Sequence, residues 1–143
     1  MSVDAWSWTT ERKLASRSAP SRRAIGDVLR QLKQHGWSPE DIFGVRLALE
    51  EALVNAIKHG NRSDLSKCVH FSCKLAPDRL WLEIRDEGCG FNPRAVPDCT
   101  DAEHVDLPNG RGLLLMRAYM SRVEYNEAGN CVVMEKHRPR ASA

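Results

Sequence analysis

LALEEALVNAIKHGN, residues Leu47 to Asn61, lies in the second half of a predicted amphipathic helix and is the most informative stretch of the sequence. At about 100° per residue, one side of this helix is apolar and is expected to face a sheet. Glu51, Asn55 and Lys58 fall on the opposite side, with His59 beside them. The residues on the apolar side are Ile42, Val45, Leu49, Leu53 and Ala56.

Two interpretations of the polar side are open. A run of polar residues on a helix is often a solvated face. Here Leu47 and Val54 flank the polar group, which indicates a face that is partly covered. In such a setting a carboxylate and an amide one turn apart can bind a divalent cation through oxygen and leave a base beside it. The helix alone does not decide between a solvated face and a site.

The start and end of this helix are well marked. Ser38 is an expected N-cap, Pro39 follows at the first helical position, and Gly60 stops the helix after His59. Before it, the sequence predicts a strand over Trp6–Arg12 and a helix that opens at Pro20 and ends at Gly36.

The rest of the chain predicts four more strands and one short helix. Alternating apolar residues indicate two hairpins, one of them around Pro77 and Asp78. The fold class is therefore a two-layer α/β sandwich, a mostly antiparallel sheet with helices on one face. We expect one domain over residues 1–143, with 138–143 as a frayed tail. The expected elements are strands Val69–Leu75 and Leu80–Ile84, a polar loop Gly88–Gly110, a helix Gly112–Met120, and strands Val123–Tyr125 and Cys131–Lys136.

Composition excludes several classes of protein. The 143 residues are 42% hydrophobic and 28% charged, with a net charge of +2, as in an ordinary soluble domain. No basic run predicts nucleic-acid binding, and no apolar stretch is long enough to span a membrane. The five cysteines form no C-x-x-C pair, which favours free thiols in the cytoplasm.

A second motif follows the strand that ends near Ile84. Asp86, Gly88 and Gly90 form a D-x-G-x-G pattern at the end of that strand. A buried carboxylate there needs a hydrogen-bond donor, and an adenine amino group would serve. The glycines let a ligand come close to the backbone. The alternative is a tight turn after an edge strand.

A third motif opens the short helix. Gly110, Arg111 and Gly112 place backbone N–H groups and a guanidinium at a helix start, where an anion is favoured. The alternative is a hinge that precedes a helix.

The order of the three motifs resembles the GHKL-type (histidine-kinase-like) ATP-binding fold, also called the Bergerat fold. Within that group, the sequence from Glu51 to Gly60 is most similar to the small anti-sigma-factor serine/threonine kinases, and the resemblance covers nearly the whole chain. It implies an enzyme that phosphorylates a serine or threonine of an anti-anti-sigma (STAS-type) partner and sequesters a sigma factor. It also implies ATP or ADP with Mg²⁺ as cofactors, and a homodimer.

The resemblance assigns roles residue by residue. Glu51 corresponds to the general base and Asn55 to the Mg²⁺ ligand, while Asp86 accepts a hydrogen bond from adenine. The remaining residues follow the same correspondence: Gly88 and Gly90 shape the base pocket, residues 91–109 form the ATP lid, Gly110, Arg111 and Gly112 meet the phosphates, and Lys58 and His59 line the phosphate side.

This chain departs from the family in two places. Asn130, Cys131 and Val132 stand where family members often place threonine near adenine, and the lid is acidic over residues 98–103. These departures favour an alternative function, a nucleotide-dependent protein-binding switch without kinase activity. A third possibility is a structural module that binds no nucleotide.

Overall fold

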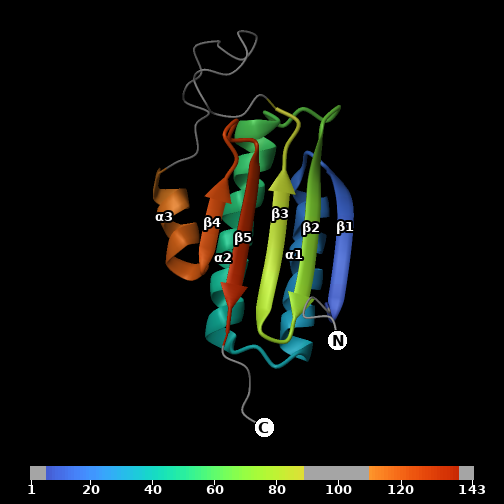
Figure 1. Cartoon of the computed structure of the whole chain (residues 1–143). Helices are drawn as coiled ribbons and strands as arrows, with labels where there is room; N and C mark the ends of the chain where they lie inside the picture. The colour runs from blue at the N-terminus through green and yellow to red at the C-terminus, as the bar shows by residue number, and fades with distance from the viewer. Residues whose placement is uncertain (1–5, 89–109, 139–143) are drawn as a thin grey trace.

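A computed structural model describes residues 6–88 and 110–138. Five antiparallel strands form one sheet in the order β1-β2-β3-β5-β4. Helices α1 and α2 cover one face of the sheet, and α3 packs beside α2 near the β4 edge (Figure 1). The predicted fold class and element order are confirmed. The strands are β1 (Trp8–Ala15), β2 (Cys68–Ala76), β3 (Arg79–Arg85), β4 (Arg122–Tyr125) and β5 (Cys131–His137); the helices are α1 (Ser18–Gln34), α2 (Pro39–Val54), a π-helical segment η1 (Asn55–Gly60) and α3 (Gly110–Tyr119).

The core lies between the sheet and the two long helices. Alternate residues of the central strands β2, β3 and β5 point toward the helices, as the period of two requires, and most of them are almost completely buried. Phe71, Ile84 and Val132 are direct neighbours across β2, β3 and β5. They meet apolar residues of α1 and α2, including Val28, Leu32, Val45, Leu49 and Leu53.

Local signals in the sequence explain where α1 ends and α2 begins. Gly36 has φ +76°, a left-handed conformation that glycine adopts without strain, and it turns the chain after α1. The Ser38 side chain then accepts a hydrogen bond from the Asp41 N–H at 3.1 Å, so the predicted N-cap is confirmed. In the described part of the chain, no helix is both long and apolar enough to cross a membrane.

The structure corrects three sequence predictions. The first strand covers Trp8–Ala15 rather than Trp6–Arg12, because its pairing with β2 extends to Ala15. Helix α1 begins at Ser18, before Pro20. The second helix is α-helical only to Val54 and then continues as the π-helical segment η1.

The π-helical segment changes the spacing of the residues that follow Asn55. The Asn61 N–H donates to the Ala56 carbonyl, five residues earlier, at 2.8 Å. Counting at α-helical spacing therefore holds as far as Asn55 and fails for the residues after it. Asn55 itself is still at α-helical spacing, since its N–H donates to the Glu51 carbonyl. It is buried, so this side of the helix is covered at Asn55 rather than solvated, while the neighbouring Val54 is 40% exposed.

We predict that two glycine-to-alanine changes will have opposite effects on stability. A Cβ on Gly44 would lie 2.8 Å from Tyr119 Cδ1, between α2 and α3, so Gly44→Ala should destabilise the protein by about 1–3 kcal/mol. A Cβ on Gly26 in α1 meets nothing within 4 Å, so Gly26→Ala should stabilise it by about 0.5–1 kcal/mol. Urea unfolding of both variants is the measurement. Equal effects of the two changes would contradict the packing of α3 on α2.

Candidate nucleotide site

Buried polar side chains gather at one end of the sheet. In the described part of the chain, five polar or charged residues are buried, and each lies in or directly beside an element that begins or ends at that end (Figure 1). Burying a polar group is costly unless it is paired, and four of the five residues make hydrogen bonds, whereas Asn55 Nδ2 has no partner among the described residues. The five are Ser16, Ser21, Asn55, Asn61 and Asp86.

Asp86 follows β3 directly, and β3 lies in the middle of the sheet. The alternative of a turn after an edge strand is therefore wrong. The Asp86 N–H donates to the Asn130 carbonyl at 2.9 Å, and its side-chain Oδ1 accepts the Gly88 N–H at 2.8 Å. Burial raises the pKa of the Asp86 carboxyl to about 6, although the Gly88 hydrogen bond and the Lys67 charge both oppose the rise.

The end of η1 lies against this carboxylate. A Cβ on Gly60 would collide with the Asp86 carboxylate, and a Cβ on Gly88 would collide with the Gly60 carbonyl. Gly60 was predicted only as a helix stop, but the structure shows that it permits a close backbone approach. The helix motif and the D-x-G motif are therefore in direct contact.

Tyr125 on β4 completes the interior of this end. Burial raises the pKa of its phenol, while contact with the Asn55 amide opposes the rise and the charges of Asp86 and Glu51 add to it. Glu51, Asn55 and Asp86 thus all act on one partly buried phenol. Among the described residues, Asn55 Nδ2 is buried without a hydrogen bond of good geometry.

For the other predicted site residues, the structure gives the element in which some of them lie, and others fall outside the described residues. Lys58 is exposed and His59 is partly buried, both in η1. Gly110, Arg111 and Gly112 form the first turn of α3, as the sequence predicted for a helix start, and this turn lies at the same end as Asp86 (Figure 1). Gly90 and the lid residues 91–109 lie outside the described residues.

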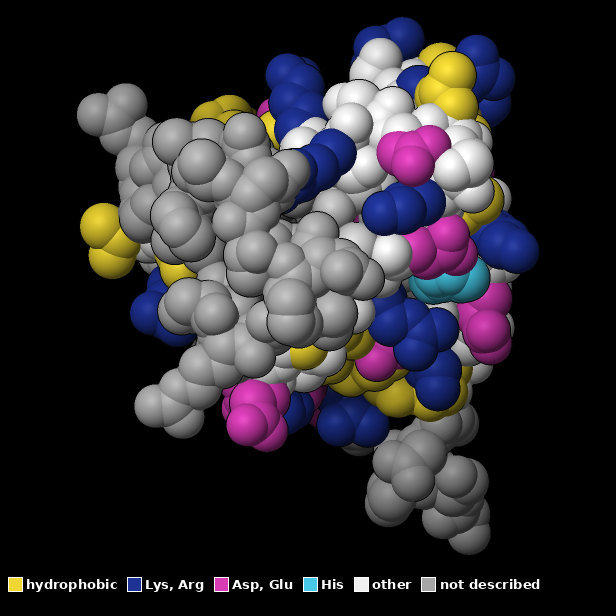
Figure 2. Space-filling model, turned by 90° about the horizontal axis from the view of Figure 1, so that it is seen from above, with side chains coloured by type: hydrophobic (Ala, Val, Ile, Leu, Met, Phe, Trp, Pro, Cys, Tyr) yellow, Lys and Arg dark blue, Asp and Glu magenta, His cyan; other side chains and the backbone are white. Residues whose placement is uncertain are grey.

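The surface at this end carries mixed charge. Seen from above, lysine and arginine side chains alternate with acidic ones and a histidine on the part that the structure describes (Figure 2). One of the ion pairs joins Glu87 to His70, with 2.7 Å between Oε2 and Nε2. Hydrogen bonds from the Cys68 N–H and from His70 lower the pKa of the Glu87 carboxyl.

Residues 14–136 match the family model of the histidine kinase-like ATPase domain. The chain belongs to this family. It is 28% identical to the serine-protein kinase RsbW of Oceanobacillus iheyensis over 109 residues, which are 71% of this chain and 69% of that protein. It is 25% identical to the anti-sigma F factor of the same species over 130 residues, 86% of each chain.

A solved structure supports the family fold. The structure of the RsbU and RsbW domains of a Mycobacterium tuberculosis protein superposes with a TM-score of 0.63 at 18% identity. The match covers 94% of this chain and 33% of that one. The match to the family model confirms the family predicted from the three motifs, and the solved structure confirms the fold.

Sequence reasoning missed three residues of this end. Asn61 is completely buried, Lys67 lies near enough to act on the Asp86 carboxylate, and Tyr125 contacts Asn55. The one feature of the sequence that could have pointed to Asn61 is its position, a polar residue directly after the glycine that ends the helix. Nothing in the sequence connects Lys67 or Tyr125 with Asp86.

We predict that Asp86→Asn stabilises the nucleotide-free protein near neutral pH. The folded-state pKa of about 6 exceeds the ordinary 3.8, so Asp86 favours the folded state only while protonated, and this contribution is lost as the pH rises from about 4 to about 6. At about pH 7.5 the variant should gain up to roughly 3 kcal/mol, and the gain should vanish below about pH 4. Urea unfolding across that pH range tests this. An equal gain at every pH would show that the ionised carboxylate is not the cause.

Proposed function

We propose that the protein is an ATP-dependent regulator of the anti-sigma type. It binds ATP or ADP, transfers the γ-phosphoryl group to a serine or threonine of an anti-anti-sigma (STAS-type) partner, and sequesters a sigma factor. It acts in the cytoplasm as a homodimer. The observation that carries the proposal is the cluster of buried polar residues where η1 meets Asp86, in a chain of the histidine kinase-like ATPase family. The relatives are named a serine-protein kinase and an anti-sigma factor, and these names support a protein substrate and a sigma factor as the partners.

Asp86 is proposed to recognise the adenine. Its carboxylate is buried and receives one N–H, from Gly88. The adenine amino group supplies a further donor, in a base pocket that Gly88 and Gly90 shape. The phosphates then lie toward the start of α3, where the N–H groups of residues 110–112 and the Arg111 guanidinium favour an anion.

Asn55 is proposed to hold Mg²⁺. In the part of the chain that the structure describes, no group of three His, Cys, Asp or Glu residues could bind a metal by itself. An Asn55 amide oxygen suits Mg²⁺, whose other ligands are commonly phosphate oxygens and water. Bound there, Mg²⁺ neutralises charge on the phosphates. Lys58 and His59 line the phosphate side of the same helix.

Glu51 is proposed to be the general base. It lies one helical turn before Asn55, is partly buried, and its charge reaches the buried end near Tyr125. From this position it would accept the proton of the attacking hydroxyl. The alternative is a nucleotide-dependent switch that holds or releases a protein partner without phosphoryl transfer, and it does not need this base.

The first test is calorimetric titration of nucleotide-free protein with ATP and with ADP, with and without Mg²⁺. We expect Mg²⁺-dependent binding that Asn55→Ala weakens by at least about tenfold, because the cation loses its protein ligand. Circular dichroism of the variant controls for loss of fold. If the wild-type protein binds neither nucleotide, the proposal is wrong, and the remaining hypothesis is a structural module that binds no nucleotide.

A second prediction separates a kinase from a switch. Glu51→Gln should lower phosphoryl transfer from ATP to a STAS-type protein by about 100-fold or more and leave ADP binding intact. Glu50→Gln is the matched control: Glu50 is the neighbouring residue, and its carboxylate pairs with Arg46 on the helix surface at 3.2 Å. Transfer that survives in both variants would favour another base. Nucleotide-dependent partner binding without transfer in the wild type would favour the switch.

A further inference from the structure

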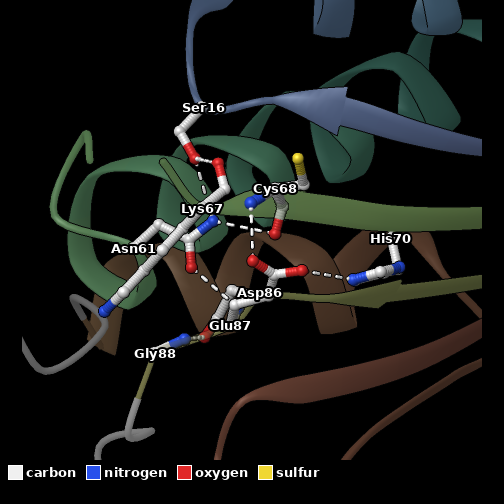
Figure 3. A network of polar contacts seen from close by, with 8 residues as sticks. All are labelled: Ser16, Asn61, Lys67, Cys68, His70, Asp86, Glu87 and Gly88. Carbon is white, nitrogen blue, oxygen red and sulfur yellow. Dashed lines mark hydrogen bonds and ion pairs between the residues drawn. The ribbon is translucent and has the colours of Figure 1, made fainter. Parts of the chain in front are cut away.

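Asn61, the last residue of the stretch from Leu47, is the most completely buried polar residue at this end. Its relative exposure is 0%. Its side-chain Nδ2 donates to Ser16 Oγ at 2.9 Å and to the Cys68 carbonyl at 3.0 Å, and its Oδ1 accepts the Glu87 N–H at 2.7 Å (Figure 3). Two donors and one acceptor are all used, which is a pattern that only an amide side chain supplies.

These three bonds connect three strands. Ser16 follows β1, Cys68 begins β2, and Glu87 lies two residues beyond β3. The Asn61 N–H also closes the π-helical segment by donating to the Ala56 carbonyl. One side chain therefore joins the end of η1 to the ends of three strands.

The bond to Glu87 bears on the Asp86 carboxylate. The Asp86 N–H is held by the Asn130 carbonyl, and the next N–H in the chain, that of Glu87, is held by Asn61. Both peptide groups that flank the Asp86 side chain are thus fixed. Gly88, whose N–H meets the Asp86 carboxylate, follows directly.

We propose that Asn61 is a positioning residue for base recognition. It does not touch the nucleotide; it orients the peptide after Asp86, and so sets the direction in which the carboxylate meets the base. This inference rests on the proposed nucleotide function. It assigns to Asn61 the preference for adenine over guanine, since guanine presents an oxygen acceptor where adenine presents an amino donor.

The experiment compares Asn61→Ala with Ser38→Ala by calorimetric titration of each protein with ADP and with GDP. Ser38→Ala is the matched control, because it also removes a side-chain acceptor of a backbone N–H, but at the far end of α2. Both variants should lose thermal stability. Only Asn61→Ala should weaken ADP binding, by at least about tenfold, and reduce the ratio of ADP to GDP affinity. A general loss of stability would lower both affinities equally.

A second readout does not depend on nucleotide. In Asn61→Ala, the carboxyl-carbon NMR titration of Asp86 should move toward the ordinary pKa, because the freed peptide lets water reach the carboxylate. If Asn61→Ala does not fold, Asn61→Ser replaces it, since the shorter hydroxyl fills the site without reaching Glu87.

The outcomes distinguish the two proposals. A folded Asn61 variant with wild-type ADP affinity, wild-type base preference and an unchanged Asp86 titration would overturn the positioning role alone. A wild-type protein that binds neither nucleotide would overturn the proposed function, and the role of Asn61 in base recognition with it.

Discussion

The backbone of Gly60 lies directly against the carboxylate of Asp86, and the arrangement of this end of the molecule follows from that contact. A side chain on Gly60 would displace the carboxylate, and a side chain on Gly88 would displace the Gly60 carbonyl. Because both contacts need bare backbone, the helix that ends at Gly60 and the strand that precedes Asp86 can approach in few ways. The same closeness excludes water from the carboxylate, which is why its pKa rises.

Much of the fold was predictable because its signals are local. The cap at Ser38, the glycine stop at Gly36 and the alternation of apolar residues in β2 and β3 each act within a few residues. The π-helical segment was not predictable in this way. Its defining bond, from Asn61 to Ala56, forms where the tertiary contacts of Asn61 hold the chain end. Asn55 itself still follows Glu51 at α-helical spacing, and its burial comes from tertiary contacts on that side of the helix, among them Tyr125.

The sequence predicted individual residues of the site better than it predicted which of them lie together. A carboxylate directly after an apolar strand predicted that Asp86 would be buried, and the structure agrees. Which residues surround it depends on contacts between distant segments. The hydrogen-bond partners of Asn61 are Ser16, Cys68 and Glu87, which lie 45, 7 and 26 positions away in the sequence. No rule of helix or strand spacing connects these positions. The family resemblance supplied the association of Glu51, Asn55 and Asp86, which the residues alone left open.

A buried carboxylate also has a consequence for recognition. Among the described residues, the Asp86 carboxylate accepts the Gly88 N–H, and burial still raises its pKa to about 6. A ligand that donates a hydrogen bond to this group stabilises the ionised form, so the pKa falls on binding and the ligand gains affinity as the pH rises through that range. A base with an acceptor at the same position would leave both groups unpaired, which is costly when water is excluded. Under the proposed function, the burial that destabilises the nucleotide-free protein is therefore also what would let one carboxylate distinguish between bases.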